Sequence, residues 1–185
     1  MTGKYEIKLH LGSGDRRLPH PPWINCDKDT ELEITEIIDA SDLHKFNTNS
    51  IDEIYASHVL DHLSRNNTLD LALHEWYRVL KPGGILRVAV SDFEMVAKMY
   101  SEGLDLERLW GHIVGGHKSD YDKHGCVFDF ALLKRYLEKH NFTDIKRYRW
   151  QDFLPEGFDD LSRCYIPHMD FENGILMSLN VRCKK

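Results

Sequence analysis

The chain has 185 residues, of which 24 are basic, 30 are acidic and 42% are hydrophobic, so its formal charge is −6. This length predicts one domain, residues 1–185, and this composition predicts a folded core, which excludes a mainly disordered chain. The net acidity argues against a nucleic-acid partner, because binding phosphates requires a basic surface. No apolar run reaches the ~18 residues of a membrane helix, and the N-terminus turns polar too soon for a signal peptide. We therefore expect a cytoplasmic protein without a membrane partner.

The four cysteines are scattered along the chain and form no CxxC pair; they are Cys26, Cys126, Cys164 and Cys183. This spacing indicates neither a disulfide framework nor a cysteine zinc site. We expect free thiols in a reducing compartment.

Alternating apolar and polar residues predict a first strand at residues 5–11, which stops at the glycine turn 12–14. Residues 23–27 predict a short second strand. Only twelve residues separate the end of the turn from the end of that strand, and three of them are prolines, so a full crossover helix barely fits. If this helix is missing, the adjacent sheet face is thinly covered, which would explain why polar Lys8 and His10 are tolerated in the first strand.

Residues 35–40 and 51–57 are typical of two more buried strands, each ending in a polar residue where a ligand could bind. The helical spacing of apolar residues predicts a helix over residues 66–80, which stops at the tight turn of residues 81–84. The next strand is expected at residues 85–91.

The sequence Ser91-Asp92-Phe93-Glu94 is typical of a capping box, and it predicts a helix that runs to about Gly103. Residues 104–127 show no regular pattern, and histidine, aspartate and glycine are concentrated in them. Because functional residues favour such loops, this segment is a candidate part of a site.

A last helix is predicted over residues 129–140, where Asn141 tolerates the left-handed cap. Strands follow near residues 145–150 and near residues 175–182, and the alternation of the second suits a sheet edge. Residues 151–173 give no clear prediction. This order of elements is typical of an α/β protein. We expect a Rossmann-like, doubly wound and mostly parallel sheet of about seven strands, with an antiparallel edge strand and a shortened first helix.

The glycine turn, GSGDRR, restricts the ligands that could bind beside the first strand. A dinucleotide requires a third small residue and a helix N-terminus aimed at its pyrophosphate. Here Arg17 occupies the third position and prolines follow, and the GxxxxGK[ST] pattern of phosphate loops is absent. The turn suits a nucleoside without phosphates, with Asp27 at the end of the next strand accepting hydrogen bonds from ribose hydroxyls. A glycine turn without a ligand is the alternative.

Four motifs in the same order resemble the Rossmann-like, or class I, S-adenosylmethionine (SAM)-dependent methyltransferases: KLHLGSG at 8–14, INCD at 24–27, DASDLHKF at 39–46 and LHEWYRVLKPGGILRVAV at 73–90. The resemblance runs over about residues 7–92, and LKPGG is its most specific marker. Two further segments are similar to a small subgroup of predicted SAM-dependent methyltransferases that is associated with cell-surface saccharide biosynthesis: IDEIYASHVLDHL at 51–63 and GGHKSDYDKHG at 115–125.

The resemblance implies SAM as the methyl donor and S-adenosylhomocysteine (SAH) as the product. Gly12, Ser13 and Gly14 would pass beneath the methionine part of the donor, and Asp27 would accept from its ribose. Ser57 would lie beside the sulfonium. Residues 1–92 would form the cofactor-binding half and residues 93–185 the acceptor side.

The adenine-binding segment implied by the resemblance is Asp39-Ala40-Ser41-Asp42-Leu43. We favour Asp42 with Leu43 as the residues that bind the adenine, and Asp39 is the open alternative. The acidic residue often found just before the glycine turn is missing, since His10 stands near its place.

Methyl transfer is an in-line displacement, so the protein mainly aligns the acceptor and manages one proton. An oxygen acceptor generally requires a base, whereas a neutral amine can attack first and lose its proton later. The candidates near the acceptor are His58 and Asp92 at strand ends and four loop residues, His117, Tyr121, Asp122 and His124. Asp92 also suits a helix cap, His58 a buried or capping position and Tyr121 a packing position.

Eleven histidines are many for a chain of this length. His58 and His62 have the i, i+4 spacing of ligands on one helix face, but the intervening VLD lacks the glutamate of the HExxH zinc signature. A second group could bind a metal only if its loop folded back on itself: His112, His117, Asp120, Asp122 and His124. We therefore expect no metal site.

The sequence predicts a SAM-dependent methyltransferase that acts on a small-molecule or saccharide-type acceptor. Oxygen is preferred over nitrogen as the acceptor atom because candidate bases are plentiful. A SAM- or SAH-binding protein without turnover is the alternative, and Arg17 disfavours a nicotinamide-dependent oxidoreductase. Residues 104–127 and 151–173 are expected to shape the acceptor site, and a monomer and a homodimer both fit.

Overall fold

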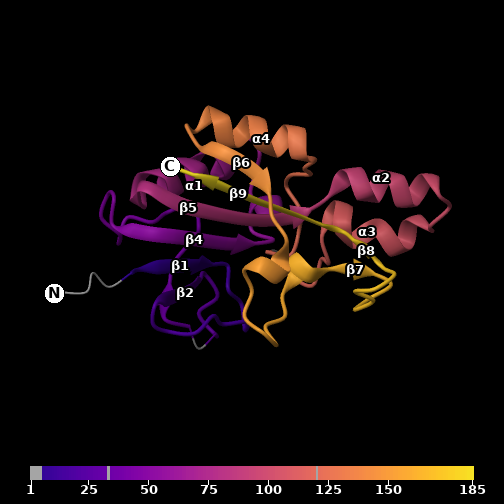
Figure 1. The fold of residues 1–185 in the computed structure, drawn as a ribbon, viewed down its shortest axis with the longest axis horizontal. Helices are drawn as coiled ribbons and strands as arrows, with labels where there is room; N and C mark the ends of the chain where they lie inside the picture. The colour runs from indigo at the N-terminus through magenta and orange to yellow at the C-terminus, as the bar shows by residue number, and fades with distance from the viewer. Residues whose placement is uncertain (1–5, 33, 120) are drawn as a thin grey trace.

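A computed structural model describes residues 6–32, 34–119 and 121–185. Its main feature is a seven-stranded sheet made of β1 (Lys8–Leu11), β2 (Trp23–Asp27), β3 (Glu36–Ile37), β4 (Ile51–Ser57), β5 (Leu80–Ser91), β6 (Thr143–Arg147) and β9 (Ser178–Lys184). The strand order is β3-β2-β1-β4-β5-β9-β6 (Figure 1). The first five of these strands are parallel, and β9 runs antiparallel to both of its neighbours. Two short strands, β7 (Tyr165–Ile166) and β8 (Ile175–Leu176), pair separately.

The helices are α1 (Thr68–Val79), α2 (Phe93–Ser101), α3 (Leu106–Val114) and α4 (Phe130–Lys139), with 3-10 turns η1 (Leu60–His62), η2 (Trp150–Asp152) and η3 (Leu161–Arg163). Figure 1 shows α2, α3 and the β7–β8 pair grouped beyond one end of the sheet, whereas α4 lies along its side. In the part of the chain that the structure describes, none of the helices combines the length and the apolar character needed to cross a bilayer.

The structure confirms the predicted Rossmann-like, mostly parallel sheet, and it changes two details. The antiparallel strand is β9, but it is not at the edge, because β6 pairs with its outer side. The shortened first helix is absent, since the described residues 12–22 between β1 and β2 contain only turns and extended backbone. The three prolines in this connection explain the absence, because proline cannot donate within a helix.

Element boundaries differ from the prediction in two other places. The first strand begins at Lys8, and the predicted start at Tyr5 lies outside the described residues. Residues 106–114, which were expected to be irregular, form α3. The Asp105 side chain caps this helix by accepting a hydrogen bond from the Glu107 amide at 2.7 Å, and such a cap satisfies one of the free amides of the first turn.

One face of the sheet carries the main hydrophobic core. It is formed by side chains such as Leu9, Leu11 and Ile54, which alternate with residues that point to the other face. These side chains pack against α1 and α4, whose buried residues recur at helical spacing: Leu69, Leu73 and Trp76 in α1 and Leu133 and Leu137 in α4. This burial fixes the register of the strands, and therefore the positions of the strand ends.

The opposite face is covered by the chain between β6 and β7, and not by a helix after β1. Trp150, Phe153 and Phe158 from this segment pack on Trp23 and Tyr55 of the sheet. The expectation of a thinly covered face is therefore wrong, since His10 is only 2% exposed. His10 is accommodated by a neighbour in register on each side: its ring bonds to Asn25 Oδ1 at 3.1 Å and stacks on Tyr55.

Candidate active site

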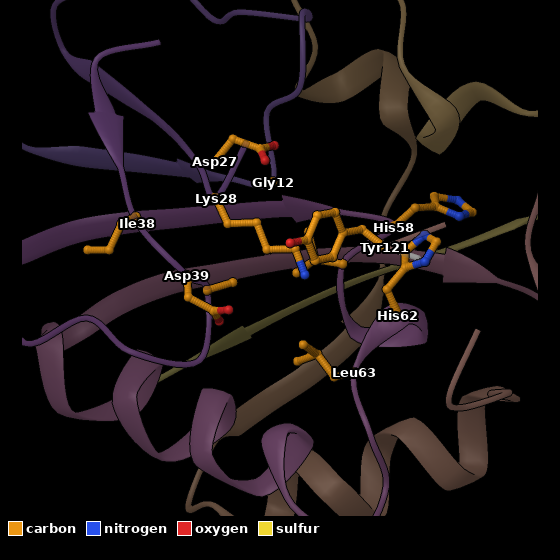
Figure 2. A pocket seen from close by; sticks show the side chains of 11 residues that line it. Gly12, Asp27, Lys28, Ile38, Asp39, His58, His62, Leu63 and Tyr121 are labelled. Carbon is orange, nitrogen blue, oxygen red and sulfur yellow. The ribbon is translucent and has the colours of Figure 1, made fainter. Parts of the chain in front are cut away.

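A pocket opens at the carboxyl ends of the parallel strands. Its lining comes from the ends of four strands and from one loop. Gly12 follows β1, Asp27 and Lys28 are at the end of β2, and Ile38, Asp39 and Ala40 follow β3. His58, Val59, His62 and Leu63 follow β4, and Tyr121 belongs to the loop beyond α3. Figure 2 shows Lys28 and Tyr121 reaching across this pocket toward one another. The Lys28 ammonium lies 4.0 Å from the centre of the Tyr121 ring. Open α/β sheets bind ligands at this edge, so the pocket is the candidate active site.

The glycine turn forms the floor of this pocket. Gly12 and Gly14 have positive φ angles of 62° and 55°, which side-chain-bearing residues rarely adopt. A Cβ atom on Gly12 would lie 2.5 Å from a methyl group of Val59, so the close approach of the turn to η1 requires glycine. A Cβ on Gly14 would meet nothing within 4 Å, which leaves open space above the turn for a ligand.

Asp27 faces the same space from the end of β2. Its carboxylate accepts hydrogen bonds from the Gly14 amide at 2.8 Å and from the Asp29 amide at 3.0 Å. A carboxylate has about four acceptor positions, so two stay available for the hydroxyl groups of a ribose. The Ser13 amide bonds to the Cys26 carbonyl at 3.1 Å and thereby fixes the turn against β2.

The three residues weighed as adenine contacts differ in where they lie. Leu43 is fully buried in the core and its amide donates to Glu75, whereas Asp42 is exposed and bonds to His44. Neither lines the pocket. Asp39 and the adjacent Ala40 do line the pocket. Asp39, the open alternative of the sequence analysis, therefore lies at the pocket, where Asp42 and Leu43 were expected. The Asp39 carboxylate accepts from the Ser41 amide and hydroxyl, which orients it.

A second, smaller pocket lies next to the first and shares Gly12 and His58 with it. Its other lining residues come from the glycine turn and its continuation, from the end of β4 and from η3: His10, Ser13, Gly14, Asp15, Arg16, Ser57, Asp160 and Leu161. The Ser57 hydroxyl is buried and has no hydrogen-bond partner among the described residues. The second pocket is therefore polar, and it adjoins the glycine turn.

His58 separates the two pockets and adopts an unusual backbone conformation, with a φ angle of 51°. Such left-handed residues other than glycine are uncommon and cluster at functional sites. Its Nδ1 lies 3.1 Å from Asp61 Oδ2, and its Nε2 lies 3.3 Å from the Ser178 hydroxyl. An ionised carboxylate only accepts hydrogen bonds, so His58 Nδ1 carries the proton of this bond. When an imidazole has one proton and it is on Nδ1, the other nitrogen, Nε2, can accept a proton.

Asp61 is the centre of a buried cluster that includes four histidines. His58 and His62 are on the same turn, and His112 and His124 come from α3 and the loop that follows it. Burial raises the pKa of Asp61, but the charge and hydrogen bond of His58 and the charges of His124 and His62 outweigh it, so this pKa is lowered. Burial and the neighbouring histidines lower the pKa of His112 to about 4 and also lower that of His124. At neutral pH the cluster therefore combines an ionised carboxylate with at least two neutral imidazoles.

Four residues expected near the acceptor lie outside both pockets: His117, Asp92, Asp122 and His124. His117 is exposed, and its ring nitrogen bonds to the Val114 carbonyl at 2.9 Å, so it closes the end of α3. Asp92 is buried, caps α2 through the Glu94 amide and pairs with Arg147 at 3.2 Å. The structure thus assigns His117 and Asp92 to helix ends. His124 belongs to the Asp61 cluster and lines neither pocket.

Two contributors to the site were missed by sequence reasoning. Asp61 is the aspartate of the VLD segment, which was used to argue against a metal. Its position three residues after His58 was the feature of the sequence that could have indicated its contact with that histidine. Asp160 lies in the segment that gave no prediction, and its carboxylate accepts from the Tyr55 hydroxyl. No local pattern could reveal Asp160, because its partner is 105 residues away in the sequence.

Comparison with known proteins agrees with this geometry. A methyltransferase domain model matches residues 24–88, about a third of the chain, and no curated protein matches. A SAM-dependent methyltransferase of Thermotoga maritima, a possible histamine N-methyltransferase, shares the fold with a TM-score of 0.59 at 18% identity, covering 97% of this chain and 82% of that one. A SAM-dependent methyltransferase of Archaeoglobus fulgidus gives 0.59 at 15% identity, with 97% and 86% covered. The CurJ carbon methyltransferase gives 0.55 at 15% identity, with 100% and 50% covered.

The fold is that of the SAM-dependent methyltransferases. The domain match over residues 24–88 and the shared fold both point to methyltransferases. They leave the acceptor open, because the similar structures include one named for nitrogen and one named for carbon methylation.

Proposed function

We propose that this chain transfers the methyl group of SAM to an oxygen atom of a small, polar, saccharide-type acceptor. The observation that carries the proposal is the position of His58, which lines both the larger and the smaller pocket and whose ring is held by the buried Asp61. A donor with its adenosine in the larger pocket and its amino-acid part over the glycine turn would bring its methyl group to this residue, where Ser57 and Asp160 of the smaller pocket would face the acceptor.

The larger pocket would take the adenosine part of SAM, with Asp27 accepting from the ribose and Asp39 accepting from the exocyclic amine of adenine. The amino-acid part would extend over Gly14, which lines the adjoining smaller pocket and has open space above it. Lys28 and Tyr121 close the larger pocket from above. When bound, SAM supplies a methyl group activated by its positive sulfur.

His58 is proposed to accept the proton of the acceptor hydroxyl. Asp61 holds Nδ1 and stabilises the positive charge that forms on the ring, as carboxylates do beside catalytic histidines. Ser178 is within hydrogen-bond distance of Nε2 and keeps this atom directed away from Asp61. An oxygen acceptor needs such a base, and a histidine whose Nδ1 is held by a buried carboxylate is suited to this role.

The class of acceptor follows from the second pocket. Its lining is mainly polar, with Asp160, Ser57 and the backbone of the glycine turn, so it suits a ligand rich in hydroxyl groups. The resemblance to methyltransferases of surface-saccharide biosynthesis points to the same class, and a cytoplasmic location belongs to the same proposal. The four cysteines are free, as expected for a reducing compartment.

The experiment that tests this proposal measures SAH formation from SAM with matched hydroxyl and amino forms of the same sugars. We expect turnover with the hydroxyl form, and a fall in kcat of about 10²- to 10⁴-fold in His58→Asn, because general-base catalysis contributes that much. The matched control is His74→Asn, which changes an exposed histidine of α1 and should leave kcat unchanged.

Two results would contradict the proposal. Turnover with the amino form alone would show a nitrogen acceptor. Tight SAM binding without turnover on any acceptor would favour the alternative, a SAM- or SAH-binding protein.

A further inference from the structure

We propose that Asp61, His62 and His124 bind a divalent transition-metal ion beside the donor pocket. Each residue offers one ligand atom, and the three atoms lie within 4.8 Å of one another. Two imidazoles and a carboxylate form a set of three protein ligands that leaves further coordination positions open. This site contradicts the expectation from the sequence that no metal is bound.

Unpartnered polar atoms in the cluster are the second observation that points to a ligand. Asp61 is 1% exposed, and its Oδ1 has no hydrogen-bond partner within the described part of the chain. The Nδ1 atom of His124 is also buried without a partner there, in a side chain that is 6% exposed. Leaving a buried charged oxygen unsatisfied costs more than a typical hydrogen bond stabilises, so an ion or a water at this point is expected.

The three ligands are held by contacts that a metal site requires. His62 Nδ1 lies 3.2 Å from the Lys123 carbonyl, which leaves its Nε2 as the ligand atom. The Gly125 and Cys126 amides donate to the Asp61 carbonyl at 2.7 Å and 3.1 Å, and they fix the loop that carries His124 against η1. A Cβ on Gly125 would lie 2.4 Å from the Leu63 carbonyl, so this approach of loop to turn depends on glycine.

His58 completes the surroundings of the site by bonding to the other carboxylate oxygen, Asp61 Oδ2, at 3.1 Å. Such bonds to a ligating carboxylate orient it and strengthen binding. Asp61 thus offers Oδ1 to the ion while Oδ2 stays with the proposed base. The arrangement places the ion next to the atoms that manage the proton.

The chemistry of the ligands selects the kind of metal. Imidazole ligands favour Zn²⁺, Fe²⁺, Co²⁺ or Ni²⁺ over Mg²⁺ and Ca²⁺, which prefer oxygen ligands. Ligand atoms about 2.0 to 2.2 Å from a tetrahedral ion are roughly 3.3 Å apart, so the side chains must rotate inward by about 1 Å or more.

The proposed role rests on the proposed function: the ion would lie beside the larger pocket, which His62 lines, and next to His58, which lines both pockets, so its open coordination positions would face an acceptor oxygen where the two pockets meet. A bound ion lowers the pKa of a coordinated hydroxyl, and His58 would then take up the released proton. Metal binding itself is independent of this role.

The test titrates chelator-treated protein with Co²⁺, followed by visible absorption, and then with Zn²⁺ in calorimetry. We expect one ion per chain. We expect the ion to bind at least about tenfold more weakly to His62→Ala, His124→Ala and Asp61→Asn, because removing a ligand weakens binding more than removing a residue that only hydrogen-bonds to a ligand. His117→Ala is the matched control, because His117 is on the same loop and outside the cluster, and its affinity should equal that of the wild type. Circular dichroism and stabilisation by SAM show that each variant is folded.

Absence of a bound ion in the wild type, or equal affinity in the three ligand variants, would overturn the inference. If SAM binding and turnover persist in that case, the proposed function stands without the metal. If an ion binds as expected but SAM does not stabilise the protein, the metal site stands and the proposed function fails.

Discussion

His10 shows how a single residue that departs from the family's pattern is held by its neighbours in the sheet. The sequence places a histidine near the usual position of an acidic residue before the glycine turn. In the structure its ring is buried, bonded to Asn25 and stacked on Tyr55. Burial lowers the pKa of His10, and the bond to Asn25 and the charges of Asp160 and Asp27 oppose this only in part.

The lowered pKa predicts a dependence of stability on pH. The unfolded chain binds a proton at His10 below a pKa of about 6.5, whereas the folded chain excludes it until a lower pH, so acid favours unfolding. His10→Gln should therefore lose less stability than the wild type between pH 7.5 and 5.5, by at most about 1.4 kcal/mol per pH unit. Urea unfolding at several pH values measures this difference. Parallel curves for the two proteins would contradict the argument, and His74→Gln, at an exposed position, should follow the wild type.

At the scale of single residues, the sequence predicted the positions of residues at strand ends better than those of residues in loops. Gly12, Asp27 and His58 line the pocket because each follows a strand whose end could be read from the pattern. The sequence alone could not decide whether Asp39 or the pair Asp42 and Leu43 lies at the pocket. That depends on where the chain turns after β3, a strand of only two residues. The partnership of Asp61 with His124 depends on the folding of a loop, which no local spacing records.

At the scale of elements, the segment from Tyr148 to Asp160 replaces the helix that the sheet lacks after β1. Phe153 is its central contact, with ring centres 4.8 Å from Tyr55 and 6.0 Å from Trp23, and the Arg87 guanidinium 4.6 Å from its ring. This replacement was not predictable, because the segment has no periodic pattern and its partners are distant in sequence. The same segment carries Asp160 into the second pocket, so it links the cover of the sheet to the acceptor side.

The role of this cover predicts the effect of a single substitution. Phe153→Ala should destabilise the protein by about 2 to 4 kcal/mol, because it removes a large aromatic side chain from a cluster that cannot refill the space. Phe93→Ala, at a side chain that is 44% exposed, is the matched control and should change stability by less than about 0.5 kcal/mol. Chemical unfolding of both variants gives the comparison. Equal effects would mean that the segment does not stabilise the sheet.

At the scale of the whole molecule, both halves of the chain contribute to one site. The strands of the first half supply the floor of the donor pocket, whereas Tyr121 covers it and His112 and His124 complete the cluster around Asp61. Parallel strands bring their carboxyl ends to one edge, so the position of the site could be predicted from the order of elements alone. The depth and polarity of the site could not be predicted in this way, because they depend on loops from the second half of the chain.

The central claim, that the pocket binds SAM through Asp27, is tested most directly by thermal unfolding with SAM, SAH or NAD. Ligand at about 100 times its dissociation constant adds ~2.7 kcal/mol, or roughly 5 to 10 °C for a chain of this size. We expect this shift with SAM and SAH but not with NAD, a smaller shift in Asp27→Ala, and an unchanged one in Asp29→Ala, which alters a neighbouring carboxylate outside the pocket. No shift with either adenosyl ligand, in a folded sample free of carried-over ligand, would contradict the account.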